Sequence, residues 1–237
     1  MKWWRRQRAL ADFTLAALAR RRVKNLSLVL VFALVVFLLA SAMFFASALR
    51  HEADVALAGA PELIVQRLTL GRQDLIPETT IDTLRAIRGV QAVKGRLWGY
   101  YYDRISGANY TVMVPDDPGL TPAPHHVIVG EGVPRARGLN WEGAPLFFSR
   151  KVGDLQRFDV ERNLGTASAL VSADLVLMNE ADFRSFFALP AGMFTDLAVS
   201  IRNEREIGTI VEKATLALPE ARFVTRADIA RTYQKLF

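Results

Sequence analysis

The stretch RRRVKNLSLVLVFALVV (residues 20–36) passes within a few residues from clustered positive charge to an unbroken apolar run. The apolar run extends from Leu26 to Leu49, 24 residues without Asp, Glu, Lys, Arg or His. At about 1.5 Å of rise per residue, a helix of this length measures about 36 Å, more than the roughly 30 Å hydrocarbon core of a bilayer. We therefore predict a transmembrane helix over residues 26–49.

A cleavable signal peptide is the alternative interpretation of the same stretch. Ala46-Ser47-Ala48 fits the small-x-small pattern that signal peptidase recognises, and cleavage there would produce a mature N-terminus at Leu49. The apolar region of a signal peptide, however, is only about 7–15 residues long. The run found here is longer and follows an extended leader, which favours a retained membrane anchor.

The distribution of charge predicts the orientation of this helix. Residues 1–25 carry a net charge of +7, and the rest of the chain carries −1 of the total of +6. Basic residues beside a span stay in the cytoplasm, so we expect a cytoplasmic N-terminus and a location outside the membrane for residues 50–237. Because the positive charge is confined to a membrane-proximal leader, anionic lipid explains it and nucleic acid is not an expected partner.

The leader, residues 1–25, has the pattern of a basic amphipathic helix on the cytoplasmic membrane face. Apolar residues recur at helical spacing between the two basic clusters, at Leu10, Phe13, Ala17 and Leu18. Trp3 and Trp4 support an interfacial position, because indole rings settle at the depth of lipid headgroups. A disordered basic leader is the alternative.

The outer region, residues 50–237, is predicted to fold as an α+β domain around its own core. The chain has no cysteine, so disulfides cannot stabilise this domain. A domain of this size buries roughly 70% of the surface of its unfolded chain, which is enough for a hydrophobic core. The absence of cysteine does not distinguish between the two sides of a membrane.

Two strand–helix–strand units are predicted within the outer region. The first consists of a strand at residues 62–68, a helix containing Ile81, Leu84 and Ile87 with Gly89 at its C-cap, and a β-rich run over residues 90–102. The second begins with a strand at residues 169–178. A helix capped by Asn179 and stopped by Pro190 follows, and then a strand in which Leu197, Val199 and Ile201 alternate with other residues.

The C-terminal part continues with one more helix and one more strand. Asn203 and Glu206 have the spacing of a capping box, and they precede a helix that Pro219 ends. A strand at residues 221–225 comes next. The predicted core face of the helix consists of Ile207, Ile210, Val211, Ala214 and Leu218.

Residues 105–168 are rich in Gly, Pro and turn signals and are predicted to form a small β-rich insertion. Short apolar segments at residues 110–114, 127–129 and 146–148 would be its strands. The outer domain would then be discontinuous, with residues 50–104 and 169–237 packed together and the insertion between them.

No catalytic, cofactor-binding or metal-ligating residue is predicted. Neighbouring residues of a strand face opposite sides, so His125-His126 is a poor metal site. Gly130-Glu131-Gly132 begins like a dinucleotide fingerprint, but Arg135 stands where the third glycine is needed. Asp116-Asp117 is typical of a turn. Ser149 and Lys151 do not have the spacing of a catalytic dyad, and the aromatic run Trp98–Tyr102 fits either core packing or a ligand groove.

The whole arrangement resembles the N-terminal half of FtsX/MacB-type ABC transporter permeases, the group that includes the LolC and LolE subunits. The leader ALADFTLAALARRRVKN (9–25) and the single span are similar to the start of such a permease. Three further segments are similar to the periplasmic core domain of the family: HVIVGEGVPRARGL (126–139), SALVSADLVLMNEADFRSFFALPAG (168–192) and TDLAVSIRNEREIGTIVEKATLALPEARFVT (195–225).

The resemblance implies a permease subunit without enzymatic activity or cofactor, located in a bacterial inner membrane with residues 50–237 in the periplasm. Such a subunit pairs with a cytoplasmic ATP-binding-cassette ATPase and with a second, identical or homologous, permease copy. Closure of the ATPase is transmitted through the spans to a periplasmic domain that moves a substrate or activates a periplasmic partner. Residues 50–104 and 169–237 would be the porter-like part of that domain, and residues 105–168 the sabre-like insertion.

Two other functions are compatible with the sequence. Family members continue into three further spans, whereas this chain ends at Phe237, so a truncated or split permease and an independent anchored module are both conceivable. The main alternative is a single-pass anchored periplasmic binding or assembly module without an ATPase. A secreted enzyme released after Ala48 is the third, and it lacks a recognisable catalytic constellation.

Overall fold

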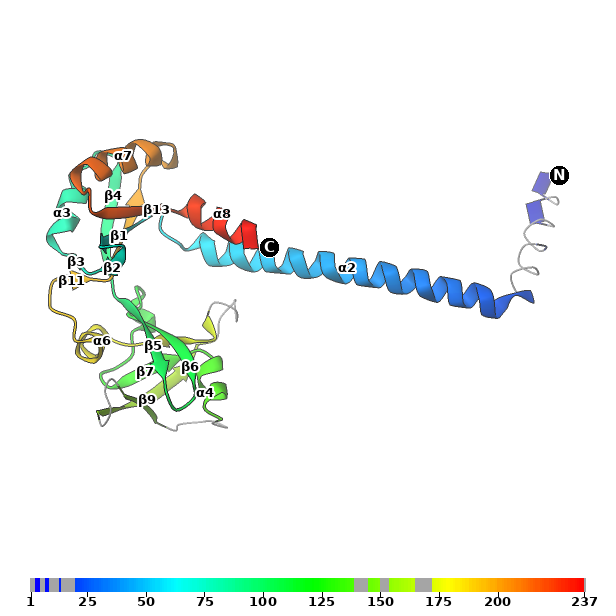
Figure 1. The fold of residues 1–237 in the computed structure, drawn as a ribbon, viewed down its shortest axis with the longest axis horizontal. Helices are drawn as coiled ribbons and strands as arrows, with labels where there is room; N and C mark the ends of the chain where they lie inside the picture. Colours follow the sequence, from blue (N-terminus) through cyan, green and yellow to red (C-terminus); the bar gives the residue numbers. More distant parts are fainter. Residues whose placement is uncertain are drawn as a thin grey trace. The chain divides into compact units, whose positions relative to one another are not determined.

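The computed structural model describes residues 3–4, 7–8, 13, 20–138, 145–149, 154–164 and 172–236. Most of the predicted amphipathic segment, including Leu10, Ala17 and Leu18, lies outside the described residues, as does Lys151. The outer unit, Glu52–Leu236, forms a compact body by itself. Its two larger sheets are seen in Figure 1.

Helix α2 (Arg22–Ala58) contains the predicted apolar span and continues beyond it. The segment Arg22–His51 is long and apolar enough to cross a membrane, and none of the side chains in its most apolar window is buried within the chain. A helix that is apolar on all sides is normally surrounded either by a protein core or by lipid, and no protein core surrounds this window. The prediction of one N-terminal apolar helix is confirmed, and the helix is longer than the 26–49 stretch.

A five-stranded sheet joins the first and last parts of the outer unit. Its strands run in the order β13-β1-β12-β4, with β2 paired to the end of β1, and all neighbours are antiparallel. The strands are β1 (Leu63–Thr69), β2 (Arg72–Asp74), β4 (Val90–Arg96), β12 (Asp196–Ile201) and β13 (Ala221–Thr225). Strand β1 therefore lies between two strands that follow it by more than a hundred residues.

Helices α3 (Thr79–Arg85) and α7 (Ile207–Ala217) cover one face of this sheet (Figure 1). Alternate residues of each strand point toward the helices, which is why the predicted alternation in β12 corresponds to burial. The shared core consists of Leu63, Val65, Val93, Leu197 and Val199 from the strands and Ile81, Leu84, Ile210 and Ala214 from the helices.

A six-stranded mixed sheet forms the second layer of the outer unit. Its order is β5-β6-β10-β7-β9-β8, in which β10–β6 and β7–β9 are parallel and the other pairs antiparallel. The strands are β5 (Trp98–Asp103), β6 (Ala108–Met113), β7 (His126–Val129), β8 (Leu146–Ser149), β9 (Leu155–Asn163) and β10 (Leu175–Leu177). A two-stranded pair, β3 (Ile76–Pro77) with β11 (Met193–Phe194), is separate from both sheets.

Aromatic rings dominate the core of the six-stranded sheet. Helix α6 (Glu180–Phe187) contributes Phe183 and Phe186, and the short helix α4 (Gly132–Ala136) contributes Val133. The rings of Tyr101, Phe148 and Phe186 meet edge to face, with centroids 5.1–6.2 Å apart. Aromatic pairs favour this geometry because the positive ring edge meets the negative ring face.

The sheets divide the chain differently from the predicted domain boundaries. Strand β5 is expected in the 50–104 part, but it pairs with β6 in the six-stranded sheet. Strand β10 and helix α6 are expected in the 169–237 part. Strand β10 belongs to the six-stranded sheet, and α6 packs against its core. The physical reason is the aromatic core, because Phe183 and Phe186 of α6 are buried against Tyr101 of β5. The two units that share the five-stranded sheet are β1–α3–β4 and β12–α7–β13.

Several helix and strand ends also differ from the prediction. Of the predicted strand over 169–178, residues 169–171 lie outside the described residues, and within 172–178 the strand β10 covers Leu175–Leu177. Helix α6 is capped by Asn179 as predicted, but it ends through left-handed Ala188 (φ 51°), so Pro190 lies beyond its end. Helix α3 ends before Gly89, which instead takes a positive φ of 102° in the turn that leads to β4. Asn203 caps a 3₁₀ turn, η2 (Glu204–Glu206), that leads into α7.

Candidate functional site

The chain enters and leaves the five-stranded sheet at the same end. Helix α2 ends at Ala58, and β1 begins at Leu63. In the antiparallel register of β1 and β13, Leu63 lies opposite Thr225, the last residue of β13. Helix α8 (Arg226–Leu236) begins at the next residue. We call the link from α2 to β1 (residues 59–62) and the start of α8 the two connections of the outer unit. They lie side by side at the ends of the neighbouring strands β1 and β13.

Arg226 bonds to both connections. Its Nε donates to the carbonyl of Ala60 at 3.0 Å, its Nη2 donates to Glu62 Oε1 at 2.9 Å, and its Nη1 is 3.4 Å from Glu204 Oε1. Its main-chain N–H donates to the carbonyl of Glu62 at 3.1 Å. The other carboxylate oxygen of Glu62 accepts from the main chain of Ile201 at 3.3 Å. We call Ala60, Glu62, Glu204 and Arg226 the Arg226 cluster.

Within this cluster, the pair with Glu62 is the stronger one. The side chains of Arg226 and Glu62 are 32% and 21% exposed, whereas that of Glu204 is 71% exposed. Exposed ion pairs contribute about 0–1 kcal/mol, because water screens them and two long side chains must be ordered. Partial burial reduces the screening, and the planar guanidinium bonds to a carbonyl and a carboxylate at once.

Thr225 and Asp228 fix the start of α8. Asp228 Oδ2 accepts from the main-chain N–H and from the hydroxyl of Thr225, at 3.0 and 2.7 Å, and Thr225 Oγ1 accepts from the N–H of Asp228. This reciprocal arrangement is a capping box. The hydroxyl and then the N–H of Thr225 hold the pKa of the Asp228 carboxyl below its ordinary value, because both donate to the charged form.

A second polar junction lies where the chain crosses between the two sheets. Asp196 is buried, and its carboxylate accepts two hydrogen bonds of 2.7 Å from Arg96 and one of 2.9 Å from the indole of Trp98. The hydroxyl of Thr195 donates to the carbonyl of Trp98 at 2.9 Å and accepts from its N–H at 3.2 Å. The chain passes between the two sheets at residues 96–98 and again at residues 194–196, and these hydrogen bonds join the two crossings.

Phe194 packs against both hydrophobic cores at this crossing. Its ring occupies the space beside Gly95 of β4, where an added Cβ would lie 2.3 Å from a ring carbon. Real Cβ atoms do not approach so closely, so glycine at this position allows the ring to reach the strand. The two layers are therefore joined by polar and by apolar contacts.

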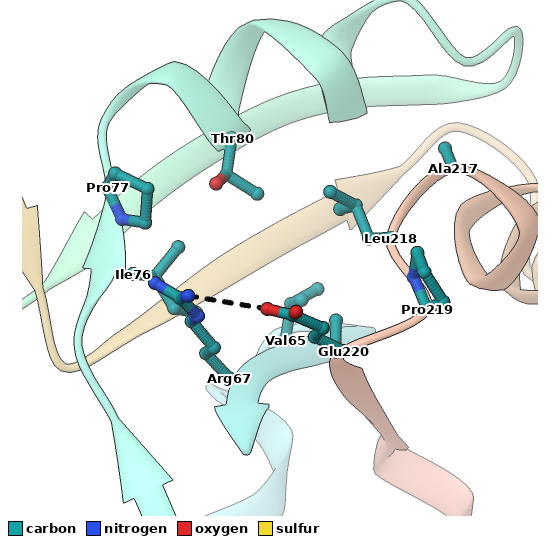
Figure 2. A pocket seen from close by; sticks show the side chains of 10 residues that line it. Val65, Arg67, Ile76, Pro77, Thr80, Ala217, Leu218, Pro219 and Glu220 are labelled. Carbon is teal, nitrogen blue, oxygen red and sulfur yellow. Dashed lines mark hydrogen bonds and ion pairs between the residues drawn. The ribbon is translucent and has the colours of Figure 1, made fainter. Parts of the chain in front are cut away.

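A recess of about 370 Å³ lies between β1, α3 and the turn from α7 to β13 (Figure 2). Figure 2 shows Arg67 and Glu220 pointing toward each other at its edge, and their closest atoms are 3.3 Å apart. Val65 and Ile76 line it but are only 0% and 2% exposed, whereas Pro77 and Leu218 are half-buried and Pro219 is exposed. Among the described residues there is no His/Cys/Asp/Glu group that could hold a metal ion.

A buried ion pair lies at the β5–β6 turn. Asp103 and Arg137 have side chains 1% and 7% exposed, and Arg137 Nε donates to Asp103 Oδ2 at 2.9 Å. Asp103 also accepts from the hydroxyl and the N–H of Ser106, and Arg137 donates to the carbonyl of Phe147. Burial raises the pKa of the nearby Tyr101 hydroxyl. With its polar atoms bonded to protein groups, this cluster holds a turn in place.

The structure shows the surroundings of three motifs considered in the sequence. The His125 side chain is 80% exposed, and the ring of His126 contacts the carbonyl of Pro124 at 2.9 Å. An added Cβ at Gly130 would lie 1.7 Å from the carbonyl oxygen of Ser172, so this glycine permits close packing. Asp117 caps a 3₁₀ turn, η1 (Pro118–Leu120), by accepting from Gly119.

The aromatic run does not line the recess of Figure 2. Tyr101 is buried in the aromatic core, Trp98 bonds to Asp196, and Tyr100 and Tyr102 are exposed. Of the residues in the two polar junctions, the sequence singled out Trp98, as part of the aromatic run, but neither Asp196 nor Arg226. For α8 a signal exists: Thr225 and Asp228 have capping-box spacing.

No protein-family model matches this sequence, and no curated protein matches it significantly. Among solved structures, the chain is similar to the extracellular domain of the noncanonic ABC-type transporter YknZ from Gram-positive bacteria, with 11% identity and a TM-score of 0.45 over 69% of this chain and 99% of that one. It is also similar to the periplasmic region of MacB from Actinobacillus actinomycetemcomitans, with 10% identity and a TM-score of 0.41 over 73% and 92% of the two chains.

Proposed function

We propose that this chain supplies the first span and the outer domain of an FtsX/MacB-type permease subunit. In this proposal the basic leader lies in the cytoplasm of a bacterial cell, α2 crosses the inner membrane, and the outer unit lies in the periplasm. A separate cytoplasmic ATPase hydrolyses ATP, and a second permease copy completes the complex. Export, lipoprotein release and activation of a periplasmic partner are the possible outputs.

The position of the two connections is the observation that carries this proposal. Leu63 and Thr225 are paired at one end of a single sheet, directly after α2 and directly before α8. Displacing α2 and α8 together would move the sheet as a unit, because both join it at this one end and its strands are held together by hydrogen bonds. The charge of the leader, +7 over residues 1–25, supports the cytoplasmic N-terminus.

The two layers suggest different roles within this function. We assign the porter-like role to the five-stranded sheet with α3 and α7, since it holds both connections. The six-stranded layer takes the sabre-like role, and the Asp196 junction would transmit displacement to it. This assignment replaces the boundaries at residues 104 and 169 with boundaries at the two crossings.

Co-purification tests the function. The membrane subunit as encoded, in lipid nanodiscs, is expected to bind the ATPase of a neighbouring ATP-binding-cassette gene and to alter its ATP turnover. Neutralising Arg20, Arg21, Arg22 and Lys24 together should weaken membrane orientation and this coupling, since basic residues beside a span determine its orientation. A variant with the exposed Arg222→Gln substitution is the control. If no ATPase associates, the permease function is rejected in favour of the alternative, an anchored binding or assembly module without an ATPase.

A further inference from the structure

Arg226 contacts three segments that are far apart in the sequence. It bonds to Ala60 and Glu62 at the start of the outer unit, to Glu204 in η2, and it is itself the first residue of α8. The bond to Ala60 is made by both Nε and Nη2. A lysine ammonium, a point charge without this planar fork, could not make all these bonds at once.

The link between α2 and β1 is the segment that Arg226 holds. Gly59 is exposed, and an added Cβ there would meet nothing within 4 Å. Ala60 and Pro61 precede the first residue of the sheet ladder, so the pairing of β1 does not fix them. The guanidinium on the carbonyl of Ala60 therefore restrains a link that would otherwise pivot at Gly59.

We propose that Arg226 is a positioning residue that holds this link against the start of α8, so that the two connections of the outer unit move together. The inference rests on the proposed function, in which helices drive the outer domain. If the link pivots freely, a displacement of α2 is absorbed at Gly59 before it reaches β1. With Arg226 in place, the displacement reaches β1, β13 and, through Glu62 and Ile201, β12.

Hydrogen exchange measured by mass spectrometry tests the positioning role on the full chain in lipid nanodiscs. Arg226→Met is expected to increase exchange by about tenfold or more in peptides covering 59–63 and 224–229, because local opening no longer has to break the cluster. Peptides covering β7 and β10 should keep their wild-type rates. Arg226→Lys, which keeps the charge but not the fork, should give an intermediate increase.

Arg222→Met is the matched control. Arg222 is an exposed arginine on β13, four residues before Arg226, and within the described part of the chain no hydrogen bond or ion pair of its side chain is found. This variant should exchange like the wild type. Unchanged exchange at 59–63 in Arg226→Met would overturn the proposal. An equal increase throughout the outer unit would overturn it too, since Arg226 would then contribute only to general stability.

A second measurement separates this inference from the proposed function. The chain lacks cysteine, so one cysteine at the exposed Leu216 can carry an environment-sensitive fluorophore. With the ATPase bound, the wild type and Arg222→Met should show an ATP-dependent fluorescence change, and Arg226→Met should retain the ATPase but lose the change. A change that persists in Arg226→Met overturns the proposal. If no ATPase binds the wild type, the proposed function fails, and the exchange result alone decides the role of Arg226.

Discussion

Asp196 and Arg96 lie directly opposite each other on β12 and β4, and two hydrogen bonds of 2.7 Å join the carboxylate to the guanidinium. The Asp196 side chain is 2% exposed, against 22% for Arg96. A third hydrogen bond from Trp98 connects this pair to the first residue of the six-stranded sheet. The register of one sheet is thus bonded to the start of the other.

Removing this carboxylate should destabilise the outer unit strongly. Asp196→Ala leaves the guanidinium of Arg96 without its partner and the indole N–H of Trp98 without an acceptor. Breaking a buried ion pair costs about 3–5 kcal/mol, and the partial exposure of Arg96 places the expected loss at the lower end of that range. Thermal unfolding of the full chain in nanodiscs, followed by tryptophan fluorescence, measures it.

The double substitution Arg96→Met with Asp196→Leu is the control for this prediction. It removes both charges and fills similar space, so it should recover the part of the stability that the unpaired Arg96 guanidinium costs, while the indole N–H of Trp98 still lacks its acceptor. A double variant as unstable as Asp196→Ala would show that shape at the crossing, rather than the unpaired charge, determines the cost.

Gly130→Ala should destabilise the six-stranded layer. The new Cβ would lie 1.7 Å from the carbonyl oxygen of Ser172, a main-chain atom, and the N–H of Gly130 already donates to Leu175 at 2.8 Å. Since main chain must move, we expect a loss of about 1–3 kcal/mol or more in the free energy of unfolding. The melting temperature should fall by several degrees, about 2–4 °C per kcal/mol at this size.

Gly208→Ala serves as the matched control for that substitution. Gly208 lies in α7, and its added Cβ meets nothing within 4 Å. Alanine should therefore stabilise the helix by about 0.5–1 kcal/mol. Equal destabilisation by the two substitutions would contradict the steric explanation for Gly130.

The start of α8 should be sensitive to acid. The pKa of Asp228 is lowered in the folded state by the hydroxyl and N–H of Thr225, so the capping contribution is fully present above the ordinary aspartate pKa of about 3.9. It is lost as the pH falls through the lowered folded value. Amide chemical shifts of Thr225 and Asp228 in the full chain should follow a transition below the ordinary range.

Asp228→Asn provides the comparison for this titration. The amide oxygen can still accept from Thr225, but the side chain no longer titrates. The acid transition at Thr225 should therefore disappear while α8 stays capped at neutral pH. A wild-type midpoint at or above the ordinary value would contradict the assigned hydrogen bonds.

Local features of the fold could be predicted from the sequence because they depend on neighbouring residues. The alternation of Leu197, Val199 and Ile201 predicts a strand and its buried face, and the structure buries all three. The spacing in α7 predicts a core face, and Ile210 and Ala214 are its buried residues. Periodicity suffices here because it reflects which side of an element faces the core.

Sheet membership and the polar junctions could not be predicted in the same way. The run from Val90 to Asp103 is continuous in composition, yet it turns from one sheet to another at Leu97. Asp196 is out of phase with the other buried residues of β12, and its buried carboxylate is bonded to Arg96 and Trp98. The partners of Arg226 lie 22 to 166 residues away, a separation that periodicity does not encode.

The position of β1 between β12 and β13 has a consequence for biogenesis. Residues 63–67 are synthesised before their ladder partners at 197–199 and 221–225, which follow them by more than a hundred residues. Strands so distant in sequence pair slowly, because a long loop must close before any contact forms. If the outer unit crosses the membrane N-terminus first, the six-stranded layer can assemble during translocation. The edges of β1 that pair with β12 and β13 then stay open until those strands are synthesised, and open strand edges are the segments most prone to aggregation.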